Sequence, residues 1–129
     1  MLAVDTNVIV RYLTRDDPEQ FARASALIRS EDVFICTTVL LECEWVLRGA
    51  YRYSRDRIAE ALRALGSLPR VTLEDQARTF TALSWFANGM DFADALHLAG
   101  TEHCAAFVSF DRSLIRRAWQ HARMPVRPA

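Results

Sequence analysis

Apolar residues along the chain alternate between short runs and longer helical repeats. The short runs, rich in β-branched and aromatic residues, predict strands at residues 2–4, 33–36 and 106–109, with a further strand near Val71. The repeats predict helices at residues 18–30 and 38–48, after Ser54, around residues 80–87, after Asp91 and after Asp111. Strands and helices therefore follow one another from end to end.

This alternation predicts an α/β fold, because neighbouring parallel strands need a crossover connection and a helix usually provides it. We expect three layers, with a central parallel sheet of four or five strands covered by helices on both faces. The length of 129 residues suits a single domain over residues 1–129.

Composition is that of a globular domain, with 51% hydrophobic and 25% charged residues. No apolar stretch has the length of a signal peptide or of a membrane span of about 20 residues, so we expect a cytoplasmic protein with no membrane partner. The net charge of zero gives no overall attraction to nucleic acid, although all sixteen basic residues are arginine, whose planar fork suits phosphate. Cys36, Cys43 and Cys104 have apolar neighbours and are predicted to be core residues.

Acidic residues follow the predicted strands at the edge where a parallel sheet binds ligands. Asp5 and Asp111 come just after strands, and Glu42 lies about one turn into the helix that follows another strand. Asp91 and Asp94 are three residues apart at the start of a helix, so their carboxylates share one face. Converging carboxylates without a basic partner favour a bound cation, and oxygen-only ligands suit Mg²⁺ or Mn²⁺.

The same acids also have a structural interpretation. Asp5, Asp91 and Asp111 occupy plausible helix N-caps, and Asp94 could complete a capping box with Asp91. Asp5 is explained least well in this way, because the two polar residues after it could cap the helix in its place.

Periodicity does not choose between Glu42 and Glu44. Glu42 shares a helix face with apolar neighbours, which is unusual for a solvated glutamate, but Glu44 has similar neighbours. His97 follows Asp94 by three residues, which is half of a di-iron signature. The other half is absent, so we interpret His97 as a packing or supporting residue.

Four segments together resemble the PIN domain family, and specifically the VapC toxins of type II toxin–antitoxin systems. The segments are VDTNV at residues 4–8, TVLLE at 38–42 with WVL at 45–47, DFADALH at 91–97 and VSFDR at 108–112. They span the chain in the family's order, and the combination is more specific than any one of them. The resemblance selects Glu42 over Glu44 and implies four site acids, Asp5, Glu42, Asp94 and Asp111, with Asp91 as an accessory acid.

The resemblance implies an endoribonuclease that depends on Mg²⁺ or Mn²⁺ and cleaves RNA unless a VapB-like antitoxin holds it. Asp5 and Asp94 would be the main metal ligands, while Glu42 and Asp111 would be further ligands or would orient the attacking water. The polar neighbours of these acids would contact the phosphate or support the acids, namely Thr6, Asn7 and Ser109.

Two other functions fit parts of the sequence. Asp5-Thr6-Asn7 is similar to a phosphatase motif with a nucleophilic aspartate, although Asn7 stands where that motif has a second aspartate. A PIN-like scaffold without activity is the other alternative, and the presence of all four acids argues against it. Residues 112–129 contain five arginines and no acid, which suits either an RNA backbone track or a solvated helix face.

The predicted helix at residues 38–48 is apolar on nearly every side. Such a helix must be fully buried, and a domain of this size has limited interior in which to bury it. We therefore expect part of it to face another chain in a homodimer, or else to pack under the helix that begins at Ser54. An acidic pocket also favours an antitoxin that presents a basic side chain.

Overall fold

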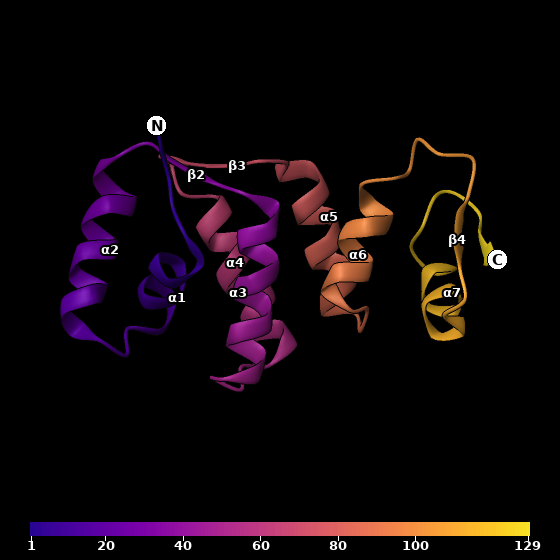
Figure 1. Cartoon of the computed structure of the whole chain (residues 1–129), viewed down its shortest axis with the longest axis horizontal. Helices are drawn as coiled ribbons and strands as arrows, with labels where there is room; N and C mark the ends of the chain where they lie inside the picture. The colour runs from indigo at the N-terminus through magenta and orange to yellow at the C-terminus, as the bar shows by residue number, and fades with distance from the viewer. The chain divides into compact units, whose positions relative to one another are not determined.

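Strands and helices alternate along the chain as the apolar pattern predicts (Figure 1). The computed structural model describes all residues from 1 to 129. The chain divides into two compact units, Met1–Gln76 and Ala77–Ala129. Each unit has its own parallel sheet, with three strands in the first and two in the second.

The first unit is built on strands β1 (Leu2–Ala3), β2 (Val33–Ile35) and β3 (Val71–Leu73), paired in the order β1-β2-β3. Leu2 lies opposite Val33, and Val33 lies opposite Val71. Four helices belong to this unit: α1 (Thr6–Thr14), α2 (Pro18–Ser30), α3 (Thr37–Gly49) and α4 (Arg55–Gly66). Since the strands are parallel, their carboxyl ends share one edge of the sheet, and α1 and α3 begin at that edge.

Local capping sets where helices α2 and α4 begin. Asp17 accepts a hydrogen bond from the backbone nitrogen of Gln20 at 3.1 Å, and Pro18 takes the first helical position of α2. Ser54 accepts a hydrogen bond from the backbone nitrogen of Arg57 at 3.2 Å at the start of α4. These two starts confirm the sequence prediction.

Helix α3 is buried on one side only, against α1 and α4. Leu40, Cys43 and Leu47 are fully buried, whereas Trp45 is 68% exposed. A single chain therefore does not bury this helix on all sides, and the expectation that its remaining side faces another chain stays a prediction. Its apolar residues are numerous enough to form a core-facing side and still leave a tryptophan at the surface.

The second unit contains α5 (Gln76–Ala87), which begins at the last residue of the first unit, α6 (Phe92–Ala99), β4 (Phe107–Ser109), α7 (Arg112–Ala118) and β5 (Val126–Pro128). Its core includes the rings of Phe86 and Phe92, whose centroids are 5.5 Å apart. Strands β4 and β5 are parallel, with Phe107 opposite Val126. The sequence pattern misses β5, because prolines at 125 and 128 break the apolar run there.

The α/β class and the parallel strands are as predicted, while the strands form two sheets in place of one central sheet of four or five. Cys43 is buried and Cys36 is partly buried, but Cys104 is exposed, so its placement in the core is wrong. Cys104 lies in the turn before β4, where apolar neighbours in sequence are not neighbours in a core. None of the helices is both long and apolar enough to cross a membrane.

Replacing a buried residue of α3 should destabilise the protein far more than replacing an exposed one. We expect Leu40→Ala to lower the free energy of unfolding by about 2–5 kcal/mol, because it removes buried methyl groups and leaves a cavity. Trp45→Ala on the same helix should change it by only about 0.5 kcal/mol. Urea denaturation of both variants measures the difference, and equal losses would contradict the one-sided burial of α3.

Candidate functional site

Asp5 stands at the carboxyl end of β1 and begins helix α1. Its backbone is extended, with φ −87° and ψ 168°, and its side chain accepts a hydrogen bond from the backbone nitrogen of Thr6 at 2.8 Å. The structural interpretation of Asp5 as a helix N-cap is confirmed, and neither of the two polar residues after it takes that position. The carboxylate is nevertheless exposed, so one face of it is left for a ligand.

Thr6 links Asp5 to Glu42. The Thr6 hydroxyl donates a hydrogen bond to Oε1 of Glu42 at 2.8 Å, which joins the start of α1 to the second turn of α3. Asp5, Thr6 and Glu42 line one pocket of about 380 Å³, together with Asn7, Val10, Arg11, Val46, Ala50 and Tyr51. The first unit thus brings together two of the four predicted acids with two of the predicted polar neighbours.

Burial and pairing distinguish the two glutamates of α3. The Glu44 side chain is 3% exposed and accepts a hydrogen bond from Nε of Arg48 at 2.7 Å, in an i,i+4 ion pair. Glu42 is exposed and its only bonded partner is a neutral hydroxyl. Glu44 therefore has a structural role, and Glu42 has no cationic partner and is available to a ligand.

Cys43 on α3 is buried, and the charges of Asp5 and Glu42 affect the pKa of its thiol. Its thiol lies 4.0 Å from the carbonyl oxygen of Thr6, at the limit of a weak hydrogen bond. Burial, followed by the negative charges of Glu42 and Asp5, raises its pKa to about 12. The thiol stays protonated at neutral pH and is not a nucleophile.

The second unit holds the other acids at the starts of two helices. Asp91 caps α6 by accepting from the backbone nitrogen of Asp94 at 3.2 Å. Asp111 caps α7 by accepting from the nitrogens of Ser113 at 2.9 Å and Leu114 at 3.1 Å. The Ser109 hydroxyl in turn accepts from the Asp111 backbone nitrogen at 2.9 Å. Both predicted caps are confirmed, and Ser109 supports Asp111 through the backbone.

Asp94 is partly buried, whereas Asp91 and Asp111 are exposed. Burial raises its pKa, and the carboxylates of Asp91 and Asp111 raise it further, while His97 acts weakly in the opposite direction. Within this unit nothing donates a hydrogen bond to the Asp94 carboxylate. A nearby cation would relieve the repulsion that the three carboxylates share.

The structure therefore places the predicted acids in two groups, Asp5 with Glu42 and Asp94 with Asp91 and Asp111. Within neither unit do three or more His, Cys, Asp or Glu side chains gather closely enough to hold a metal ion by themselves. The prediction that all four acids meet in one pocket concerns both units and stays a prediction. The donors available in each group are carboxylate oxygens with little or no cationic pairing, which is the chemistry that suits Mg²⁺ or Mn²⁺.

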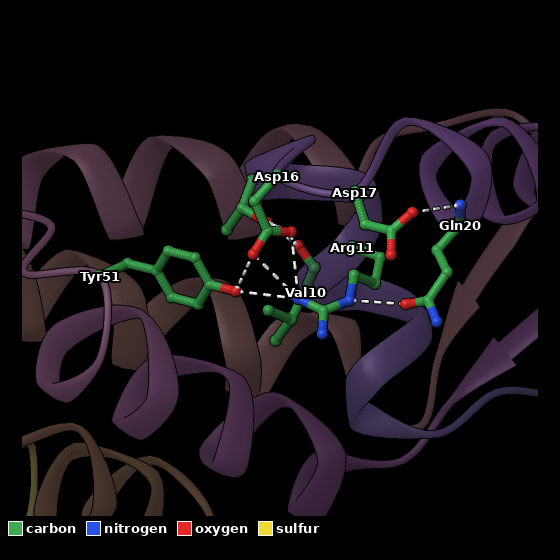
Figure 2. Close-up of polar contacts among 7 residues, drawn as sticks. Val10, Arg11, Asp16, Asp17, Gln20 and Tyr51 are labelled. Carbon is green, nitrogen blue, oxygen red and sulfur yellow. Dashed lines mark hydrogen bonds and ion pairs between the residues drawn. The ribbon is translucent and has the colours of Figure 1, made fainter.

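Sequence reasoning missed the ionic network at the rim of the first pocket (Figure 2). Arg11 donates from Nη1 to both carboxylate oxygens of Asp16, at 3.0 and 2.9 Å, and to the Tyr51 hydroxyl at 3.0 Å. Its Nε donates to Gln20 at 2.6 Å. Tyr51 donates to Asp16, which is the largest cause lowering the pKa of Asp16. Arg11 and Tyr51 are 40 residues apart, and Arg11 and Asp16, although only 5 residues apart, do not belong to a recognisable sequence motif.

The sequence was also compared with known proteins. Residues 2–120 match the model of the PIN domain, a stretch that includes segments of both units. No curated protein matches the chain.

Removing the charge of Asp94 should stabilise the protein at neutral pH. A raised pKa means that the folded state binds this proton more tightly than the unfolded chain does, so stability falls as pH rises from the ordinary value of 3.8 through the folded pKa. Asp94→Asn should therefore melt higher than the unmodified protein at pH 7 in chelator, and the gain should vanish near pH 3. Asp17→Asn is the control, because its carboxylate caps α2 and asparagine caps equally well. A gain for Asp94→Asn that does not change with pH would contradict this account.

Proposed function

The chain belongs to the PIN domain family, whose members are generally nucleases, and we propose that it is a metal-dependent endoribonuclease serving as the toxin of a type II toxin–antitoxin pair. The observation that carries the proposal is the pocket of Asp5 and Glu42. Arg11 lines the same pocket, yet its guanidinium pairs with Asp16 and with neither of the two acids. A pocket that holds unpaired carboxylates next to an arginine bound elsewhere suits a cation and a phosphate together.

We assign the four acids Asp5, Glu42, Asp94 and Asp111 as the metal ligands, with Asp91 as an accessory. Bound Mg²⁺ or Mn²⁺ would supply charge stabilisation at the phosphate and an acidified water. The chain's own residues prepare these ligands. The Thr6 hydroxyl fixes the orientation of Glu42, and the amide of residue 6 fixes Asp5.

The remaining polar residues have supporting roles in this proposal. The Asn7 amide faces the pocket and can donate to a phosphate oxygen. Ser109 holds the backbone at Asp111, which in turn is oriented by two backbone nitrogens of α7. The amino end of a helix also favours a negatively charged ligand or side chain beside it.

The partners expected of such a toxin are a second copy of the chain and a small antitoxin. Trp45 is a large exposed side chain on α3, and Arg48 and Arg52 nearby in sequence are also exposed. Aromatic and arginine side chains of this kind are enriched in protein interfaces. We propose that this side of α3 contributes to a homodimer and that the antitoxin directs a basic side chain at the acidic pocket.

Cleavage of single-stranded RNA should require Mg²⁺ or Mn²⁺ and stop in chelator. Asp5→Asn and Asp94→Asn should each lower the rate more than about 100-fold, since even residues behind metal ligands are worth about 10–100-fold. Gel assays of a labelled RNA, with circular dichroism to check the fold, measure this. Hydrolysis of a small phosphate ester without RNA cleavage would favour the phosphatase alternative. The absence of both activities would favour the inactive scaffold.

The two glutamates of α3 supply a matched control for that experiment. Glu42→Gln should lose activity with the fold intact, because the amide keeps its shape without the charge. Glu44→Gln should keep activity but lower the free energy of unfolding, because it breaks the pair with Arg48. The opposite result would mean that the wrong glutamate has been assigned.

The partner proposal predicts a dimer in solution. Light scattering at micromolar concentration should report twice the chain mass of 14.7 kDa for the unmodified protein. The Trp45→Glu variant should have the mass of one chain, because the substitution places a charge on the proposed contact. Co-expression with the neighbouring gene should yield a complex. A monomer with no such complex would contradict the partner proposal and leave the nuclease assignment unaffected.

A further inference from the structure

A second pocket of about 360 Å³ lies between helices α1 and α2. Residues of both helices line it: Asn7, Val8, Arg11, Gln20, Arg23, Ala24 and Leu27. Its floor combines apolar side chains with two arginines, and it contains no acid. None of the site acids belongs to it, so the nuclease proposal does not account for it.

This pocket adjoins the pocket of Asp5 and Glu42. Asn7 and Arg11 line both of them, and they are four residues apart on α1, on one face of the helix. A ligand that extends from the acidic pocket across these two residues would therefore reach the α1–α2 pocket. We call these two adjoining pockets together the α1 groove, with an acidic end at Asp5 and Glu42 and a basic end at Arg11 and Arg23.

The two arginines of the basic end retain donors for a ligand. Arg11 uses Nε and Nη1 in its bonds to Gln20, Asp16 and Tyr51, as Figure 2 shows, while Nη2 has no hydrogen bond. Arg23 is exposed and has no ion pair or hydrogen bond. Because Asp16 balances only one charge, the groove keeps a net positive charge at this end.

We propose that the basic end of this groove binds the RNA strand beside the bond that is cut, with Arg11 and Arg23 each contacting a backbone phosphate. The inference rests on the proposed nuclease function. Arginine is well suited to phosphate, and the apolar floor of Val8, Ala24 and Leu27 can receive a sugar or an unpaired base. An unpaired strand fits this better than a duplex does, since its bases are free to enter the pocket.

The contacts of Arg11 give it a positioning role as well. Asp16 and Tyr51 hold its guanidinium at the junction of the two pockets, so it does not turn to pair with Asp5 or Glu42. The acids stay available for a cation, and the arginine stays available for a phosphate. A pre-oriented guanidinium also loses less conformational freedom when the strand binds.

The test measures binding of a labelled single-stranded RNA of mixed sequence at several salt concentrations, with Mg²⁺ and in the Asp94→Asn background so that the RNA survives. Each phosphate contact contributes about 0.7 to the slope of log affinity against log salt for a single strand. Arg23→Ala should therefore flatten the slope by about 0.7. Arg29→Ala is the matched control, an exposed arginine on the same helix outside the pocket, and it should leave the slope unchanged.

The unmodified protein could bind and cut RNA while the Arg23→Ala and Arg29→Ala variants give equal slopes. That result would overturn the proposed RNA site in the groove and leave the nuclease proposal unaffected. An unmodified chain that neither binds nor cuts RNA would overturn both. Arg23→Ala that weakens binding of a co-expressed protein partner but leaves the RNA slope unchanged would show that the groove receives protein, and would also overturn the proposal.

Discussion

The hydrogen bond that begins a helix is the interaction on which the arrangement of the candidate acids depends. Three of the five acids, Asp5, Asp91 and Asp111, occupy helix N-caps, where backbone nitrogens donate to them. Capping and chemistry are alternatives when the sequence is considered alone. In the structure the hydrogen bond that begins the helix also fixes the direction of the carboxylate, so a capping role does not exclude a chemical one.

Much of the fold and of the candidate site could be predicted from the sequence, because caps, strand ends and short motifs depend on a few neighbouring residues. The starts of α2, α4, α6 and α7 follow from the identity of one or two residues each. The role of Glu44 could not be predicted, since it depends on which side of α3 meets the core, and both glutamates have apolar neighbours. The family resemblance selects Glu42, but the physical difference between the two, the burial of Glu44 and its pair with Arg48, is visible only once the helix is placed.

Features that join distant segments were the ones that sequence reasoning missed. Tyr51 meets Arg11 across forty residues, and the hydroxyl of Thr6 meets Glu42 across thirty-six. Strand β5 forms despite its prolines because pairing with β4 supplies what local propensity lacks. Trp45 and Cys104 show the reverse case, in which apolar surroundings in sequence do not lead to burial.

The buried thiol of Cys43 affects which ligand atoms the proposed metal would meet. Ionised sulphur beside Thr6 and Glu42 would attract soft ions, and zinc above all would then compete strongly for the acids. With a pKa of about 12 the sulphur hardly ionises at neutral pH. The groups beside this thiol that could meet a metal are therefore oxygens only, those of Asp5, Thr6 and Glu42.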